Sequence, residues 1–143
     1  MKAIGLRHYL SIDDPLALED VQIDAPAAPQ GQDLLVQVQA VSVNPVDTKL
    51  RSARAGEENP PRVLGFDAAG VVIAVGPEVT AFEVGDEVYY AGDVTRPGCN
   101  AQQQLVDERL VGRKPTTLDF AEAAALPLTT LTAWELLFQR MPY

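Results

Sequence analysis

Polar side chains stand directly beside two apolar runs of the sequence, at positions where they could face a cleft. Asn44 and Asp47 follow the run at 34–43, and Asp67 lies within the stretch GFDAAG at 65–70. Pro45 has a fixed φ and no N–H, which favours the first turn of a helix. Asn44 is then a natural N-cap, and Asp47 is a first-turn acid that the helix dipole favours. Because a cap residue can also face a cleft, a structural and a functional role stay open for both.

One histidine and one cysteine are present, the residue types most often used for acid–base and nucleophilic chemistry. His8 has no visible partner, and we expect it at the surface or with its hydrogen bonds satisfied near a strand end. Cys99 lies in a glycine-containing loop without a helix N-terminus or basic cluster, so an unactivated thiol is expected. A single cysteine excludes an internal disulfide and any zinc site built from cysteines.

Short strands separated by turns are the main pattern along the chain. The clearest strand is 34–43, in which Val36, Val38 and Ala40 share one face. Further strands are predicted at 2–6, 18–23, 70–75, 103–106 and 110–114, with one more through Tyr90, and loops at 57–61 and 91–100. A short helix is predicted at 46–53, and two helical pieces divided at Pro127 follow Phe120. This order predicts a mainly β protein with a few helices, an irregular barrel or sandwich.

Length and charge limit the classes of protein that the chain can represent. Its 143 residues correspond to about one domain, and its formal net charge is -9. An excess of acidic residues repels phosphate backbones, so we expect no nucleic-acid partner, whereas a small neutral substrate stays compatible. The first residues lack the apolar core of a signal peptide, and no apolar stretch reaches membrane-spanning length. The expected location is therefore the cytoplasm, without a membrane partner.

Four stretches together resemble a known family over nearly the whole chain. They are VSVNPVDTKLR, LGFDAAGVVIAVGPEV, FEVGDEVY and AEAAALPLTTLTAWELL, in the order usual for the N-terminal GroES-like catalytic domain of the medium-chain dehydrogenase/reductase superfamily. Within it the chain is similar to the quinone oxidoreductase branch, and its stretch 89–115 is similar to zinc-type alcohol dehydrogenase-like proteins. The resemblance implies a GroES-like irregular β-barrel over 1–126. It also implies a helical segment, 127–143, that leads toward a Rossmann cofactor domain, before which this chain ends.

The residues at three positions depart from those of the zinc-dependent members of the superfamily. Those members have zinc ligands at the positions of Asn44 and Phe66 and near Leu128. Zinc is held by thiolate, imidazole or carboxylate groups, so these three side chains imply no metal site. Phe66 is then either an ordinary core residue or an apolar wall where a ligand would stand, and Asp67 beside it is a further polar group.

The resemblance also implies a reaction and the residues that serve it. The implied activity is zinc-independent transfer of hydride from NADPH to a quinone or an α,β-unsaturated carbonyl compound. The segment Asn44, Pro45, Val46 and Asp47 is implied to line the nicotinamide side of the cleft, with Asn44 and Asp47 as the catalytic positions. Thr132 is implied to approach the nicotinamide ribose or amide. In these terms the chain is the catalytic-domain part of a reductase.

A different class of function stays open beside the reductase. The glycines at 65, 70 and 76 do not fit G-x-G-x-x-G, so no phosphate-binding loop is visible and activity of the chain by itself is not expected. The alternative is a stand-alone, non-enzymatic GroES-like domain used for partner binding or dimerisation. In either case the helix at 129–138 is expected to have an apolar face that is partly uncovered or paired in a homodimer.

Overall fold

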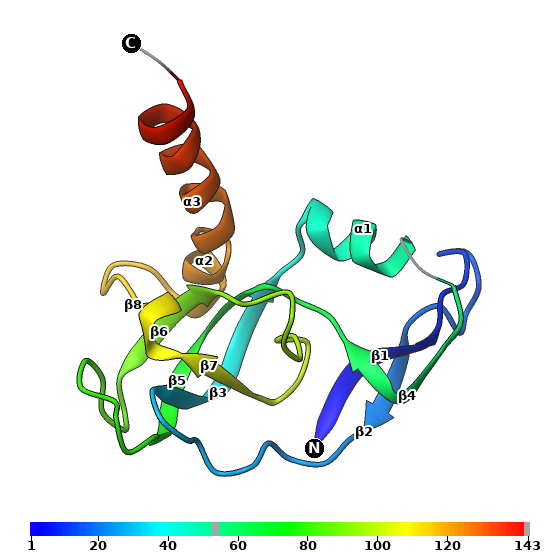
Figure 1. The fold of residues 1–143 in the computed structure, drawn as a ribbon, viewed down its shortest axis with the longest axis horizontal. Coiled ribbons are helices and arrows are strands. Elements are labelled where there is room, and N and C mark those ends of the chain that lie inside the picture. Colours follow the sequence, from blue (N-terminus) through cyan, green and yellow to red (C-terminus); the bar gives the residue numbers. More distant parts are fainter. Residues whose placement is uncertain (53–54, 142–143) are drawn as a thin grey trace.

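The computed structural model describes residues 1–52 and 55–141, and its chain is built mainly of strands (Figure 1). The eight strands in these residues are β1 (Lys2–His8), β2 (Glu19–Gln22), β3 (Asp33–Ser42), β4 (Glu57–Val63), β5 (Asp67–Val75), β6 (Glu87–Ala91), β7 (Gln103–Asp107) and β8 (Val111–Arg113). The helices are α1 (Pro45–Ser52), α2 (Phe120–Ala124) and α3 (Pro127–Glu135), with a 3-10 turn, η1 (Glu108–Leu110), and a π-helical turn, η2 (Leu136–Arg140). The predicted mainly β class with a few helices is confirmed.

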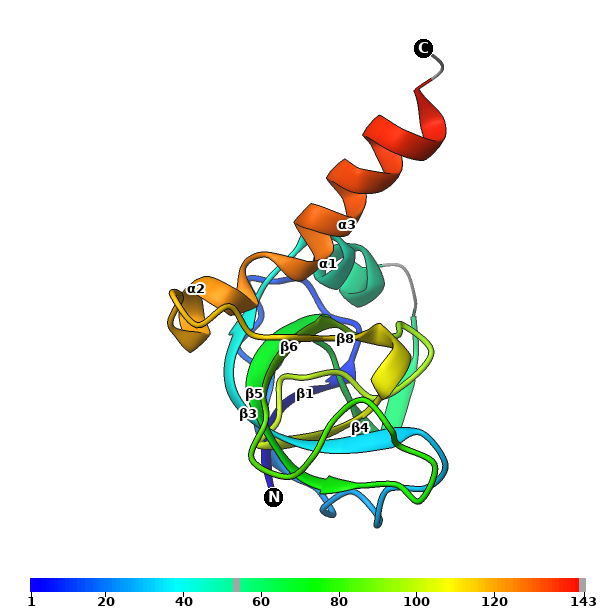
Figure 2. The same cartoon turned by 90° about the vertical axis from the view of Figure 1, so that its left-hand side faces the viewer.

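Two antiparallel sheets form the body of the protein. The first has the strand order β2-β1-β4, and the second has the order β7-β3-β5-β6-β8. A bridge between Ala3 and Ala101 joins β1 to the segment that precedes β7. Figure 2 shows that the strands curl around a common interior instead of forming flat layers. The arrangement matches the irregular barrel or sandwich that the strand pattern predicts.

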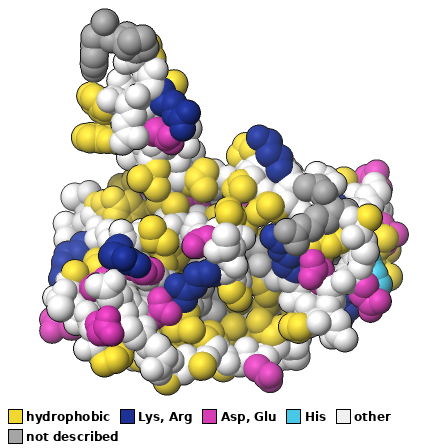
Figure 3. All heavy atoms as spheres, in the orientation of Figure 1, with side chains coloured by type: hydrophobic (Ala, Val, Ile, Leu, Met, Phe, Trp, Pro, Cys, Tyr) yellow, Lys and Arg dark blue, Asp and Glu magenta, His cyan; other side chains and the backbone are white. Residues whose placement is uncertain are grey.

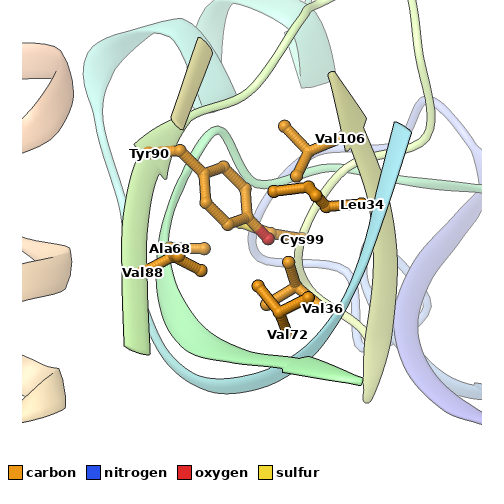
Figure 4. Close-up of a cluster of buried hydrophobic side chains, with 8 residues drawn as sticks. All are labelled: Leu34, Val36, Ala68, Val72, Val88, Tyr90, Cys99 and Val106. Atoms are coloured by element: carbon orange, nitrogen blue, oxygen red, sulfur yellow. The ribbon is translucent and has the colours of Figure 1, made fainter. Parts of the chain in front are cut away.

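The core fills the space enclosed by the five-stranded sheet (Figure 4). Leu34 and Val36 point inward from β3, as period-two alternation requires, and both are fully buried. The buried side chains that complete this cluster are Ala68, Val72, Val88, Tyr90, Cys99 and Val106. Tyr90 is the only one that carries a hydroxyl group, which donates to Gln104 Oε1 at 2.8 Å, and burial raises its pKa. The interior is therefore a packed apolar core with its buried hydroxyl satisfied.

The segment 57–61 differs from its predicted loop. It belongs to β4, which pairs antiparallel with β1. Because β4 lies at the edge of its sheet, Pro60 and Pro61 leave no ladder bond unmade on the side away from β1. Two other predicted boundaries move inward, since the strand predicted at 110–114 is β8 preceded by η1, and the one predicted at 18–23 is β2. The predicted end of the first helix, Ala53, lies outside the described residues.

The C-terminal helix projects away from the body (Figures 1 and 2). The two predicted helical pieces are α2 and α3, and Pro127 is the first residue of α3. Beyond its first turn the apolar side chains are exposed, including Leu131 at 60%, Trp134 at 59% and Phe138 at 56%. Figure 3 shows hydrophobic side chains on the surface of the protruding segment. Within residues 1–52 and 55–141, no helix combines the length and apolar character needed to cross a membrane.

Candidate functional site

The ends of three elements meet at one corner of the protein. The antiparallel pairing of β3 with β5 places Ser42, at the end of β3, opposite Asp67, at the start of β5. The chain leaves β3 through Asn44 and enters α1, so α1 begins beside the start of β5. The start of α3 reaches the same place from the other end of the chain, because the Leu128 amide donates to Asp67. The corner is thus assembled from segments more than 60 residues apart.

Asp47 fixes the backbone at this corner. Its Oδ2 accepts a hydrogen bond from the Asn44 amide at 2.9 Å, which is the reach-back half of a capping box. Its Oδ1 accepts from the Gly65 amide at 2.9 Å, where the backbone has φ +102°, a conformation that favours glycine. Asp47 is only 7% exposed. Both oxygens are therefore engaged by backbone groups, and Asp47 acts as a clamp between α1 and the segment that precedes β5.

The side chain of Asn44 does not cap α1 as predicted. Asn44 does stand directly before the helix, and its carbonyl oxygen accepts from the Asp47 amide at 3.0 Å. Its side chain is turned instead toward β5, where Nδ2 donates to Asp67 Oδ2 at 2.8 Å. The bond from Nδ2 to a carboxylate is charge-assisted and therefore stronger than the neutral bond that Oδ1 would accept from a helix amide, which explains the preference. The Asn44 side chain therefore belongs to the hydrogen-bond network of the corner and not to the cap of α1.

Asp67 is the centre of the corner, although it was not among the predicted site residues. It is fully buried, and its Oδ1 accepts from the Leu128 amide at 2.9 Å while its Oδ2 accepts from Asn44. Loss of solvation raises the pKa of Asp67, the hydrogen bonds from Asn44 and Leu128 oppose this rise, and the charge of Asp47 adds to it. The sequence signal for this residue was a single carboxylate within an apolar run, between Phe66 and two alanines.

Phe66 forms an apolar wall at the corner. It is 2% exposed and packs in a buried cluster with Leu6 and Leu64. The partly buried side chains against this cluster are Tyr9, Val46, Leu50 and Leu128. The residues at or near the positions where the resemblance implies zinc ligands are thus a carboxamide bonded to Asp67, the buried Phe66 and the partly buried Leu128. These groups do not fit a zinc ion, which takes thiolate, imidazole or carboxylate ligands.

The described ranges also hold no other cluster of side chains that suits a metal ion. In residues 1–52 and 55–141 no three or more His, Cys, Asp or Glu side chains lie together as a metal site would need. Asp47 and Asp67 are the acidic pair of the corner, and both use their oxygens for hydrogen bonds from N–H groups.

The remaining predicted site residues are brought near the corner to different degrees. Pro45 is exposed at the start of α1, and Val46 packs against the Phe66 cluster. Thr132 lies one turn beyond Leu128 on α3, exposed, and its hydroxyl donates to the Leu128 carbonyl at 2.8 Å. The structure therefore joins Asn44 and Asp47 in one hydrogen-bond network, whereas Thr132 is linked to it only through α3.

Cys99 lies against the same corner, and we expect its thiol to be inert. It is 1% exposed, its Sγ donates to the Asp67 carbonyl at 3.3 Å, and burial raises its pKa to about 12. At pH 8 a thiol-specific reagent should label the folded chain roughly 1000-fold more slowly than the chain unfolded in urea, because the thiolate is the reacting form. Since the chain has one cysteine, the label count is unambiguous. Equally rapid labelling of folded and unfolded chain would contradict the buried placement.

The family of the chain follows from comparison with known proteins. Residues 30–133 match the alcohol dehydrogenase GroES-like domain, and this chain belongs to that family. The match includes β3, α1, β5 and most of α3, so the corner lies within the family's own domain. The resemblance to a GroES-like domain is therefore confirmed.

Individual relatives place the chain beside proteins that are named as dehydrogenase-like or as reductases. It is 47% identical over 138 residues to a zinc-type alcohol dehydrogenase-like protein of Staphylococcus epidermidis, covering 96% of this chain and 40% of the relative. It is 40% identical over 145 residues to 2-methylene-furan-3-one reductase of Solanum lycopersicum, covering 94% of this chain and 36% of that enzyme. The chain thus spans about 40% of the length of the first of these curated relatives.

Solved structures agree with this placement. The chain superposes on a provisionally named zinc-dependent alcohol dehydrogenase protein from Rhizobium etli CFN 42 with a TM-score of 0.92 and 57% identity, covering 96% of this chain and 40% of the other. It superposes on Escherichia coli quinone oxidoreductase, solved in complex with NADPH, with a TM-score of 0.81 and 29% identity, covering 97% and 41%. The chain is therefore a GroES-like domain of the medium-chain dehydrogenase/reductase type, similar both to the structure named as a zinc-dependent alcohol dehydrogenase and to the quinone oxidoreductase.

Proposed function

We propose that this chain is the catalytic-domain part of a zinc-independent, NADPH-dependent oxidoreductase that transfers hydride to a quinone or an α,β-unsaturated carbonyl compound. The observation that carries the proposal is the composition of the corner, in which a bonded carboxamide, Asn44, and two apolar side chains, Phe66 and Leu128, stand at or near the positions where the resemblance implies zinc ligands. A quinone or enone is already electron-poor, so its reduction requires no Lewis acid. The relatives named as a quinone oxidoreductase and a 2-methylene-furan-3-one reductase support this substrate class.

The chain's own residues suit a site that positions a cofactor and excludes water. NADPH would supply the hydride, and Asn44, Pro45, Val46, Asp47 and Thr132 are the residues proposed to lie beside it. Phe66 and its cluster close the floor of the corner to solvent. Asp47 holds the backbone of Asn44, so that the side-chain amide is presented in one place. Orientation of two reactants in a dry site is the main contribution that a protein makes to hydride transfer.

The test compares cofactor binding by two forms of the protein. NADPH fluorescence is titrated with the 143-residue chain and with a form extended by the coding sequence that follows it in the gene. We expect saturable binding by the extended form and much weaker binding by the chain itself, which has no G-x-G-x-x-G loop. Binding by neither form would end the reductase proposal. Stoichiometric zinc in the extended form, measured by elemental analysis, would overturn the zinc-independent mechanism.

A second function, partner binding or dimerisation, is favoured by one observation, the exposed apolar side of the C-terminal helix. Three of its large side chains are more than half exposed: Leu131, Trp134 and Phe138. The rings of Trp134 and Phe138 pack on each other with their centroids 4.5 Å apart. Single chains seldom leave large apolar groups together in water without a partner surface. In this reading the helix supports a homodimer of the chain.

Self-association is the measurable consequence of the exposed helix. Sedimentation velocity over a concentration series should show dimers of the unaltered chain, and L131Q/W134Q/F138Q should weaken the association by about 100-fold or more, since each large side chain contributes ~1.5–3 kcal/mol when buried. Thr129→Gln, at an exposed polar position on the opposite side of the same helix, is the matched control and should leave the association unchanged. A chain that stays strictly monomeric at its highest soluble concentration would contradict the prediction.

A further inference from the structure

The Asn44 carboxamide has one end held and one end open. Its Nδ2 donates to the buried Asp67 carboxylate at 2.8 Å. All side-chain nitrogen and oxygen atoms that are closed to solvent in residues 1–52 and 55–141 have a hydrogen-bond partner. No side chain or backbone group in these ranges donates to Asn44 Oδ1, so this oxygen must reach solvent although the residue as a whole is 6% exposed. The open end of the amide is therefore a hydrogen-bond acceptor.

We propose that Asp67 is a positioning residue that sets the orientation of the Asn44 carboxamide, so that Oδ1 faces solvent at the corner and accepts from an N–H or O–H group of the ligand. A carboxylate accepts hydrogen bonds only, so the amide end that faces it must be the nitrogen. The inference rests on the proposed function for the identity of the ligand. In that function the matching donor is the carboxamide N–H of the nicotinamide.

The choice of aspartate at position 67 is explained by the number of donors that it serves. The Leu128 amide and Asn44 Nδ2 both point at this side chain, and each needs an acceptor oxygen. An asparagine at position 67 has one acceptor oxygen and one donor nitrogen. Once its oxygen accepts from Leu128, its nitrogen faces Asn44, which must then turn its own oxygen inward. A change of one functional group at position 67 would therefore reverse what Asn44 presents to a ligand.

The surroundings leave Asn44 little freedom to escape this control. Its backbone amide is held by Asp47 Oδ2, and the Asp47 carboxylate is itself tied to the Gly65 amide. The Asp67 backbone carbonyl accepts from Cys99 Sγ, so the residue is anchored on both sides. With the Asn44 backbone held in this way, Asp67 decides which end of the side-chain amide faces β5. A merely structural Asp67 would affect stability without affecting which amide atom is exposed.

The test uses three variants of the 143-residue chain. In Asp67→Asn the bond from the Leu128 amide is kept, and the Asn44 side-chain amide should turn over. In N44D/D67N the donor and the acceptor are exchanged between the two positions, so an acceptor oxygen at position 44 faces solvent again. Asp67→Ala removes both bonds and is the control for stability. Nitrogen-15 NMR of the side-chain amides should show the Asn44 Nδ2 protons protected from exchange in the unaltered chain and exposed in Asp67→Asn. Unchanged Nδ2 protection in Asp67→Asn would overturn the positioning role.

The functional arm uses the extended form and NADPH titration. We expect Asp67→Asn to weaken NADPH binding by about 10-fold, the size of one lost ligand hydrogen bond, and N44D/D67N to return it to within about threefold. Equal weakening in the single and double variants would mean that Asp67 acts through stability alone and would overturn the proposal. If the unaltered extended form binds no NADPH, the proposed function and the nicotinamide donor are both wrong, whereas the amide orientation is still decided by the NMR arm.

Discussion

Replacing Gly70 by alanine is expected to lower the free energy of unfolding by about 3 kcal/mol or more. Gly70 lies in β5, between β3 and β6 in the larger sheet, and pairs with Val38. A Cβ atom at this position would stand 2.3 Å from the Gln37 carbonyl oxygen and 2.8 Å from a methyl carbon of Val36. The nearest obstacle is backbone in the middle of a sheet, which cannot move aside as the end of a flexible side chain can. The whole β3–β5 pairing must shift to admit one methyl group.

Gly92 is a matched control for this substitution. A Cβ atom there would lie 3.5 Å from Gln104 Nε2 and 3.9 Å from the Phe66 Cα atom, both ordinary contact distances, and its φ is not positive. Gly92→Ala should therefore change the free energy of unfolding by no more than about 0.5 kcal/mol. Guanidinium unfolding followed by the fluorescence of Trp134 and by circular dichroism gives both values. Equal midpoints for the two alanine variants would show that β3 and β5 are not packed as closely as described.

Patterns within a few residues predicted those elements whose conformation depends only on neighbouring residues. The alternation along 34–43 predicted β3 with Val36, Val38 and Ala40 on one face, of which Val36 is fully buried and Val38 packs beside it. Pro45 predicted the first turn of α1. Period-two burial and a fixed φ depend on residues within a few positions of each other. The same is true of the division between α2 and α3, since Pro127 begins the second helix.

The roles of Asp67 and of the segment 57–61 could not be obtained in that way. Asp67 bonds to Asn44, 23 residues before it, and to Leu128, 61 residues after it, so its partners exist only once β3, β5 and α3 have assembled. The segment 57–61 is proline-rich and reads as loop, and becomes strand because β1 offers it an open edge. In both cases tertiary pairing overrides local preference.

The corner also shows how one residue can carry a structural and a functional signal that the sequence cannot separate. An asparagine before a proline predicts a cap, and a cap would turn the Asn44 side chain toward α1. Instead, Asn44 Nδ2 donates to the buried Asp67, which turns the side chain away from α1. Of the capping box only the half made by Asp47 is present, in which its carboxylate accepts from the Asn44 backbone amide. Because the side chain is turned toward β5, Asn44 Oδ1 stays an open acceptor at the corner. In an N-cap the same oxygen would accept from an amide of α1.

Phe66→Ala is expected to lower the free energy of unfolding by about 3–5 kcal/mol. Phe66 is 2% exposed among Leu6, Leu64 and the partly buried Leu128, and removal of its ring leaves a cavity that these neighbours cannot fill. Two of these neighbours, Leu6 in β1 and Leu128 in α3, come from opposite ends of the chain. The ring therefore joins the smaller sheet to the helix that leaves the body, and its loss should loosen both.

Phe138→Ala supplies the contrast for the same chemical change at an exposed position. Phe138 is 56% exposed on the protruding helix, so this variant should change the free energy of unfolding of the monomer by about 0.5 kcal/mol or less. Both variants are measured by thermal and guanidinium unfolding at a concentration low enough to exclude dimers. A Phe66→Ala chain as stable as Phe138→Ala would mean that the zinc-ligand position of this corner is open space and not an apolar wall. In that case elemental analysis of Phe66→Ala and of the unaltered chain would test this position for a bound metal.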